Sequence, residues 1–277
     1  MNEPVPSLPA VLTFAATDPT SGAGLQADLL APASMGCYPL SVVTALTVQD
    51  TAGVEAFHAM DPEWVADQAR CILEDMPVAA FKMGMLGSVE IVTVVAEVVS
   101  DYPDVPLVLD PVFASGRGDE FANEDMVSAI RELLVPQSTV VTPNIPELRR
   151  LAGEDDDNPA SLAECAQSLL DSGCEYVLVT GTHDSTPEVI NTLYHRGGVL
   201  RADTWQRLPG SYHGSGCTLA SALAANLARG LDIGDAAYEA QDYTWHALAH
   251  AFRPGMGQYL PDRLFWAREG AGNNDDK

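Results

Sequence analysis

The chain has 277 residues, 47% of them hydrophobic and 19% charged, which suffices to bury the core of one sizeable α/β domain. Its 39 acidic and 14 basic side chains give a formal net charge of −25, so nucleic acid and anionic membranes are expected to be poor partners. No apolar run reaches membrane-spanning length, and Met1–Ala10 lacks the basic and apolar segments of a secretory signal.

The cysteines favour a reducing, cytoplasmic setting. They are odd in number and contain no CxxC pair, so neither a disulfide framework nor a zinc site is expected. The acidic excess has two interpretations: a solvated shell that keeps the protein soluble, or adaptation to high salt, where screening relieves the self-repulsion. In either case an anionic substrate gains little from the global field, so its binding contacts must be local.

Apolar runs of strand length alternate with segments of helical spacing along the chain. The expected strands are Val11–Ala16, Ser41–Val48, Ala79–Met83, Pro106–Val112, Thr139–Thr142, Tyr176–Val179 and a hairpin over 188–204. The expected helices are Leu25–Ser34, Pro62–Leu73, Val89–Val99, Glu124–Leu134, Ser161–Leu170, 217–229 and 234–251. This alternation predicts a mostly parallel sheet with helices on both faces. We expect one domain over 1–277, with an ordered core over about 10–266 and a flexible tail over 268–277.

Polar side chains follow the expected strands at the point where each ends. Asp18, Gln49, Asp110 and Asn144 occupy such positions. Ligands of parallel α/β sheets collect outside the carboxyl ends of the strands, so this rim is the predicted binding site.

The segment from His213 to Ala222 is a glycine-hinged loop that runs into an apolar helical segment. The first backbone N–H groups of a helix have no internal partner and attract anions, and Gly214 and Gly216 allow a phosphate to approach closely. Cys217 falls in the first turn, where the same field is expected to favour a thiolate. The alternative is an ordinary glycine turn with Cys217 as a small core residue.

A second motif, Thr142-Pro-Asn-Ile-Pro-Glu147, places Asn144 and Glu147 at the same rim, with Pro146 suited to the first turn of a helix. Together with Asp110, Glu147 could hold Mg²⁺, which takes one or two carboxylates and keeps most of its waters. The alternative for this motif is a helix cap with an acidic first turn. The side-chain amide of Gln49 suits the edge of a heterocycle, or simply ends a strand. The dinucleotide-binding motif GxGxxG does not occur. The motif GxxxxGK[ST] does not occur either, which argues against a P-loop kinase.

These motifs occur together, and in this order, in one known family. The chain resembles the hydroxymethylpyrimidine/phosphomethylpyrimidine kinases of thiamin biosynthesis, within the ribokinase-like superfamily. The resemblance covers about 10–266. It is carried by Ala15-Ala-Thr-Asp-Pro-Thr-Ser-Gly-Ala-Gly-Leu-Gln-Ala-Asp28, Thr44-Ala-Leu-Thr-Val-Gln-Asp-Thr51 and His213-Gly-Ser-Gly-Cys-Thr-Leu219, with support from Asp110-Pro-Val112 and Thr142-Pro-Asn-Ile-Pro-Glu147.

The resemblance implies a ribokinase-like three-layer α/β/α sandwich, ATP as co-substrate, Mg²⁺, a small pyrimidine substrate and a homodimer. Cys217 would be the base that acts on the substrate hydroxymethyl group. The other implied roles are pyrimidine contacts at Asp28, Gln49, Met85 and Val112, an anion hole at Gly214, Ser215 and Gly216, Mg²⁺ contacts at Asp110 and Glu147, and ATP contacts at Asn144 and Thr180.

The chain departs from the family pattern at two lysine positions. Gly116 stands where a strand-end lysine is expected, and Arg117, one residue on, is the candidate replacement for phosphate binding. The family's KGGH is here Thr180-Gly-Thr-His183, which lacks a lysine near the ATP phosphates, and Ala16 replaces a glycine. These losses bear on the second phosphorylation, because the phosphomethylpyrimidine brings a phosphate of its own.

Three functions stay open. The first is ATP-dependent phosphorylation of 4-amino-5-hydroxymethyl-2-methylpyrimidine, with or without phosphorylation of its monophosphate. The second is a pyridoxine/pyridoxal kinase, since relatives with this pocket accept a similar ring. The third is a catalytically weak pyrimidine-binding module, which the two absent lysines motivate.

Overall fold

A computed structural model describes residues 8–114, 118, 120–153, 160–181 and 186–269. Within these residues one nine-stranded sheet has the order β3-β2-β1-β4-β5-β6-β7-β8-β9. The strands are β1 (Ala10–Ala16), β2 (Tyr38–Gln49), β3 (Val54–Ala59), β4 (Ala80–Met83), β5 (Leu107–Leu109), β6 (Val140–Val141), β7 (Tyr176–Val179), β8 (Glu188–His195) and β9 (Gly198–Gln206). The strands from β2 to β7 in this order run parallel, and β3, β8 and β9 are antiparallel additions at the two edges.

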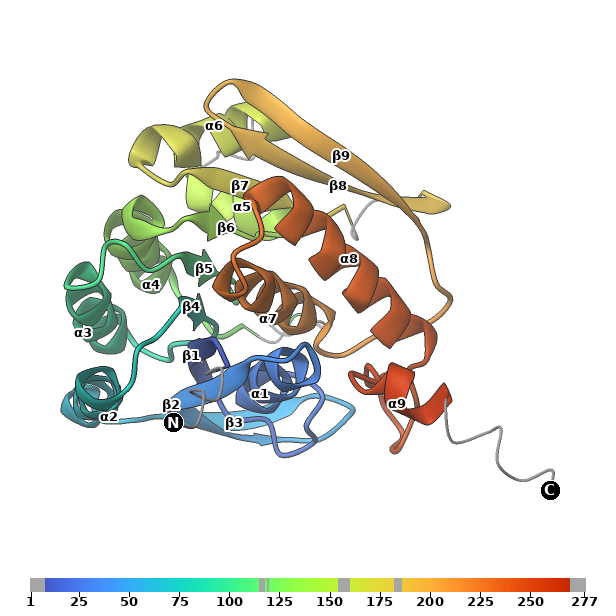
Figure 1. Cartoon of the computed structure of the whole chain (residues 1–277), viewed down its shortest axis with the longest axis horizontal. Coiled ribbons are helices and arrows are strands. Elements are labelled where there is room, and N and C mark those ends of the chain that lie inside the picture. The colour runs from blue at the N-terminus through green and yellow to red at the C-terminus, as the bar shows by residue number, and fades with distance from the viewer. Residues whose placement is uncertain (1–7, 115–117, 119, 154–159, 182–185, 270–277) are drawn as a thin grey trace, which may run out of the picture.

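Helices cover both faces of the sheet, as Figure 1 shows. The helices are α1 (Gly24–Ser34), α2 (Pro62–Asp75), α3 (Val89–Ser100), α4 (Glu124–Ala129), α5 (Ile145–Ala152), α6 (Leu162–Ser172), α7 (Ser215–Ala228), α8 (Ile233–Ala249) and α9 (Phe265–Glu269). One buried apolar cluster joins the sheet to α2 through α6, and a second joins its other face to α1, α7 and α8. The predicted three-layer α/β/α sandwich is confirmed.

Each expected strand and helix is present, with ends that shift by a few residues. The helix expected over 124–134 is α4 followed by a π-helical turn, Ile130–Leu134. Helix α7 begins at Ser215, two residues before the expected start, so Ser215 and Gly216 belong to its first turn. Residues 268 and 269 of the expected flexible tail end α9, and 270–277 lie outside the described residues.

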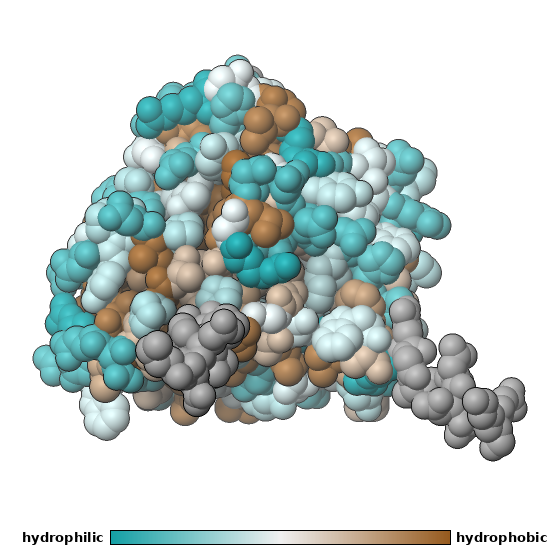
Figure 2. Space-filling view, in the orientation of Figure 1, coloured by the Kyte–Doolittle hydropathy of each residue, from teal (hydrophilic) through white to brown (hydrophobic). Residues whose placement is uncertain are grey.

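Three elements are missing from the lists of expected strands and helices: β3, α9 and α5, of which only the start near Pro146 was expected. Strand β3 was missed because it is short, lies mostly exposed at the sheet edge and carries Glu55 and His58 among its apolar residues, so no regular apolar alternation marks it. The short helix α9 is only five residues long. No helix in the described part of the chain is long and apolar enough to cross a membrane. On the face drawn in Figure 2, hydrophilic side chains predominate and the hydrophobic areas are small.

Candidate active site

The predicted rim forms where the parallel strands end beside the start of α7. Asp110 follows β5, and Asn144 and Thr180 follow β6 and β7. An isolated parallel bridge joins Asn144 to Thr180, whose N–H donates to the carbonyl of Pro143 at 3.0 Å. The two expected ATP residues therefore lie next to each other.

The loop after β1 packs against the loop before α7. Asp18 is buried and accepts hydrogen bonds from the N–H groups of Thr20 at 2.8 Å and Ala23 at 2.7 Å. The Thr20 hydroxyl and His213 Nε2 also contact its carboxylate, each at 2.8 Å. Burial would raise the pKa of Asp18, but the hydrogen bonds from His213 and Thr20 outweigh it and hold that pKa below its usual value. The Asp18–His213 contact fixes the two glycine-rich loops relative to each other.

Gly214 is required by this packing. It has a left-handed backbone with φ of 83°, and a Cβ atom there would lie 1.8 Å from the carbonyl oxygen of Gly22. The loop can therefore present its backbone at the start of α7 only with glycine at 214. Ser215 and Gly216 follow as the first two helical residues, with N–H groups free of intrahelical partners. This is the expected anion site.

A buried lysine stands under the anion loop. Lys82, on β4, is 0% exposed, and its Nζ lies 2.9 Å from Asp28 Oδ2 and 3.4 Å from Asp110 Oδ2. Burial opposes its charge, but Asp28 and Asp110 outweigh burial and raise the pKa of Lys82. The other oxygen of Asp28 accepts a hydrogen bond from Ser221 at 2.6 Å. Asp28 is thus fully buried and held by protein groups, so its predicted pyrimidine contact has no support from the geometry.

Asp110 and Glu147 form a carboxylate pair that suits a divalent cation. Asp110 Oδ2 is buried without a hydrogen-bond partner, and burial together with Asp110 raises the pKa of Glu147 to about 8. Among the described residues no cluster of three or more His, Cys, Asp or Glu groups could hold a metal. Two carboxylates fit Mg²⁺, which takes its remaining ligands from water and phosphate.

For the 142–147 motif, the alternative interpretation as a helix cap is confirmed. Asn144 caps α5 and forms a capping box with Glu147, in which each side chain accepts the other's backbone N–H at 2.9 Å. The box fixes Glu147 at the rim, so capping and metal binding are compatible roles of one side chain.

The expectation of a thiolate at Cys217 is wrong for this site. Burial and the carboxylate of Asp110 raise the pKa of the Cys217 thiol, Asp28 adds to this effect, and Lys82 only partly opposes it. Burial is the largest of these effects, so the pKa of the Cys217 thiol lies above its usual value and not below it. Cys217 is nevertheless partly exposed at the start of α7, within reach of a ligand.

A small apolar wall lies beside these groups. Met85 is buried in a cluster with Ala16 and Ala45, and Val112 packs against it. Gln49 and His213 line a small cleft together with Gln258. Of the four expected pyrimidine contacts, Met85 and Val112 thus share one apolar cluster and Gln49 lines the small cleft. Arg117 lies outside the described residues.

Lys82, Ser221 and Arg263 are buried polar residues of the site that the sequence analysis missed. The available signal was Lys82 itself, because it interrupts an apolar strand in a chain whose only other lysine is Lys277. Arg263 is 3% exposed and contacts both glycine loops.

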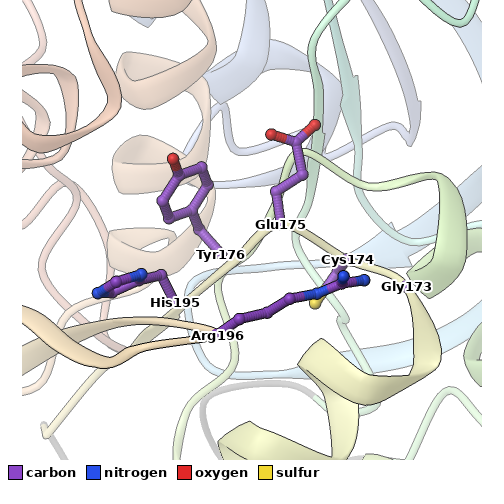
Figure 3. Close-up of a pocket in the computed structure, with 6 residues that line it drawn as sticks. All are labelled: Gly173, Cys174, Glu175, Tyr176, His195 and Arg196. Atoms are coloured by element: carbon purple, nitrogen blue, oxygen red, sulfur yellow. The ribbon is translucent and has the colours of Figure 1, made fainter.

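A separate surface pocket of about 370 Å³ lies away from the rim, at the end of the sheet where β7 begins. Figure 3 shows it between the start of β7 and the turn after β8, with Glu175, Tyr176, His195 and Arg196 around it. Its side chains carry mixed charges, and none of them belongs to the rim.

Comparison with known proteins agrees with the fold and the motifs. The family model described as phosphomethylpyrimidine kinase matches residues 18–262. The hydroxymethylpyrimidine/phosphomethylpyrimidine kinase of Escherichia coli is 37% identical over 245 residues, which covers 87% of this chain and 91% of that protein. The thiamine biosynthesis bifunctional protein ThiED of Geobacter sulfurreducens is 37% identical over 248 residues, 90% of this chain, but the chain spans only 51% of its length.

Solved structures give the same result. The pyridoxal kinase of Staphylococcus aureus in complex with ADP has a TM-score of 0.86 and 28% identity, and the match covers 95% of this chain and 96% of that one. The phosphomethylpyrimidine kinase of Clostridium difficile has a TM-score of 0.75 and 31% identity, covering 87% and 99%. Family model, relatives and fold agree, and the chain belongs to the phosphomethylpyrimidine kinase family of ribokinase-like α/β proteins.

Proposed function

We propose that this protein transfers the γ-phosphoryl group of ATP to the hydroxymethyl group of 4-amino-5-hydroxymethyl-2-methylpyrimidine, in thiamin biosynthesis. One observation carries the proposal. The glycine loop that opens α7 and the Asp110–Glu147 pair lie at the same rim of the sheet. Beside them lies the apolar wall with Met85. The names of the relatives support the same substrate class.

The reaction is an in-line displacement. The substrate alcohol oxygen forms a bond to the γ-phosphorus while the bond to the bridging oxygen of ADP breaks. The alcohol proton passes to the sulfur of Cys217, which acts as the base once the thiol has released its own proton to solvent. Backbone N–H groups at the start of α7, from Gly214 to Gly216, stabilise the charge on the transferring group.

Asp110 and Glu147 would hold the magnesium ion, and Asn144 and Thr180 would contact ATP beside it. When bound, Mg²⁺ neutralises phosphate charge and offsets the carboxylates that keep the proton on Cys217. Gln49, at the cleft with His213, would recognise the ring edge through its amide.

The proposal is tested by substituting the base. Cys217→Ala is expected to lose most ATP-dependent phosphorylation while its circular dichroism spectrum and melting temperature stay near those of the wild type. Cys217→Ser is the shape-matched variant and is expected to be impaired too, because a serine hydroxyl loses its proton far less readily than a thiol and so forms much less of the anionic base. Near-normal turnover of Cys217→Ala would remove this residue from the mechanism.

Pyridoxal phosphorylation is the second candidate, favoured by the likeness to the Staphylococcus aureus pyridoxal kinase, solved with AMP-PCP and pyridoxal at a TM-score of 0.84. A coupled ATPase assay with hydroxymethylpyrimidine, its phosphate and pyridoxal separates the candidates by kcat/KM. Turnover of the phosphate would establish the second step, for which Arg117 is the candidate phosphate contact. Ligand binding without ATP consumption on any of them would favour a pyrimidine-binding module.

We also propose a cytoplasmic homodimer. Leu46 and Val48 on β2 are 49% and 58% exposed and alternate with less exposed residues, so they share one face of the edge hairpin. Burying this face against a second copy would remove it from water. Leu46→Glu together with Val48→Glu should yield monomers in sedimentation, whereas Leu200→Glu on the opposite edge strand β9 should leave the dimer intact. The cytoplasmic part rests on the free state of the five cysteines.

A further inference from the structure

Arg263 lies between α8 and α9 and is almost completely buried. Its main chain is anchored to α8, because its carbonyl accepts a hydrogen bond from Tyr243 Oη at 2.8 Å and the neighbouring Asp262 N–H donates to the Ala247 carbonyl at 2.9 Å. These main-chain hydrogen bonds hold the backbone of this segment in place, so its position does not depend on the arginine side chain alone.

The guanidinium group of Arg263 reaches both glycine loops of the site. Nη1 donates to the carbonyl of Ser21 at 3.1 Å and Nη2 to that of Gly22 at 2.5 Å. Nε donates to Thr218 Oγ1 at 3.1 Å, and the Thr218 hydroxyl donates in turn to the Gly214 carbonyl at 2.7 Å. One planar group therefore joins the loop after β1 to the first turn of α7.

The charge of Arg263 lacks a close counter-ion. Its three acceptors are two carbonyls and a hydroxyl, and among the described residues no carboxylate lies within 4.0 Å of the guanidinium. Burial lowers the pKa of Arg263, yet an arginine remains charged in proteins. The carboxylates of Asp28 and Asp18 act on this charge from a longer distance and only partly offset its burial. A buried charge without a close counter-ion is costly, so the folded protein gains when an anion approaches it.

The anion that can do so is the phosphoryl group that the proposed function places at the start of α7. We propose that Arg263 is a positioning residue for phosphoryl transfer, which holds the two glycine loops at a fixed spacing and places a positive charge behind the anion loop. In this role it offsets the loss of the family's two phosphate-side lysines. This inference rests on the proposed kinase function. In it, Arg263 supplies positive charge without contacting the substrate.

The test compares two variants that both lose the planar fork but differ in charge. Arg263→Lys keeps the charge and Arg263→Gln removes it. Arg268→Gln is the matched control, because Arg268 belongs to the same segment but is exposed, paired with Asp262 at 3.1 Å. The readouts are kcat and KM for both substrates, and the rise in melting temperature caused by inorganic phosphate or by AMP-PCP with Mg²⁺.

We expect Arg263→Gln to lower kcat about tenfold or more relative to Arg263→Lys and to lose the phosphate-dependent rise in melting temperature. Arg268→Gln should match the wild type in both. Equal kcat and equal phosphate response in Arg263→Lys and Arg263→Gln would overturn the proposal, because a purely structural arginine would be affected by loss of the fork alone.

A second variant keeps the proposal testable if Arg263→Gln does not fold. Thr218→Val removes the hydroxyl between Arg263 and the Gly214 carbonyl and leaves the charge in place. It should lower kcat and retain the phosphate-dependent rise in melting temperature, and a wild-type kcat would overturn the positioning role.

Failure of the kinase proposal has a different signature. In that case the wild-type protein phosphorylates none of the alcohols, whereas failure of the Arg263 proposal leaves an active wild type with indistinguishable charge variants.

Discussion

Lys82 lies in a central strand of the sheet with no exposed surface and with the carboxylates of Asp28 and Asp110 around its ammonium group. A buried lysine is tolerated only when such partners stabilise its charge. The same contact lets Asp110 remain at the rim beside Glu147. Lys82 therefore acts on the carboxylate side of the site without touching the substrate.

Lys82→Met should be strongly destabilising, because it leaves two buried carboxylates without their cation. We expect a loss of about 3–5 kcal/mol in the free energy of unfolding, measured by urea denaturation at neutral pH. The double variant Lys82→Met with Asp28→Asn should recover part of the loss, since the amide removes one unpaired charge. Wild-type stability of Lys82→Met would contradict the assignment of Lys82 as the essential counter-ion.

Glu147 predicts a pH dependence of magnesium binding. Its pKa of about 8 means that the side chain is mostly protonated at pH 7, and Mg²⁺ must displace that proton to bind. The apparent affinity for Mg²⁺ should therefore increase about tenfold per pH unit below about pH 8 and level off above it. Calorimetric titration of Mg²⁺ in the presence of AMP-PCP measures this slope.

Glu147→Gln is the control for that slope. A glutamine at this position can still accept the backbone N–H of Asn144, so the capping box is retained while the titrating proton is lost. The variant should bind Mg²⁺ more weakly and with little pH dependence. A slope equal to that of the wild type would assign the proton to another group.

At the scale of elements, a chain of oriented hydrogen bonds ties the end of β7 to β8, β9 and α8. The Gly181 N–H donates to Asn191 Oδ1 at 3.1 Å, and Asn191 Nδ2 donates to Gln241 Oε1 at 3.0 Å. The same oxygen accepts Trp205 Nε1 at 2.9 Å, while Gln241 Nε2 donates to Asp203 Oδ2 at 2.9 Å. Each amide is fixed by donors and acceptors on both sides, so the segment beside Thr180 is held in one orientation.

This network predicts a selective effect on ATP. Asn191→Leu removes the acceptor of the Gly181 N–H and should raise KM for ATP by about tenfold, with KM for the pyrimidine unchanged. Trp205→Phe is the matched control, because it removes one bond to the same Gln241 oxygen and leaves Asn191 in place. Steady-state kinetics with each substrate varied in turn provide the measurement, and a joint rise of both KM values in Asn191→Leu would refute the assignment.

Features that depend on short stretches of sequence could be predicted. Apolar runs, helix caps and glycines identified the layers, the parallel sheet and the rim, because strand ends in a parallel sheet meet at one edge. The links that hold the site together were not predictable in this way. Lys82 and Asp28, or Arg263 and Gly22, are far apart in sequence and carry no shared local pattern. The raised pKa of Cys217 likewise depends on burial and on the carboxylates of Asp110 and Asp28, which come from distant parts of the chain.

At the scale of the whole molecule, acidic side chains far outnumber basic ones, and two of the basic side chains, Lys82 and Arg263, are buried in the site. The chain has only 14 basic residues against 39 acidic ones, and Lys82 and Arg263 are both buried near the anion loop. A surface of this kind repels ATP at long range. The site offsets that repulsion at short range through Arg263 and through the N–H groups that open α7.

The same charge distribution decides how salt acts on stability. If the acidic shell is an adaptation to high salt, the folded state suffers self-repulsion in dilute buffer, and screening at molar salt relieves it because the Debye length falls to about 3 Å. The melting temperature should then rise by at least about 4 °C between about 0.1 M and 1 M NaCl. A variant with Glu74→Gln, Asp75→Asn, Glu97→Gln and Glu239→Gln, all on exposed positions of α2, α3 and α8, should be less sensitive. A melting temperature that does not rise with NaCl would leave the acidic shell as a device for solubility, since solubility needs net charge but no stabilisation by screening.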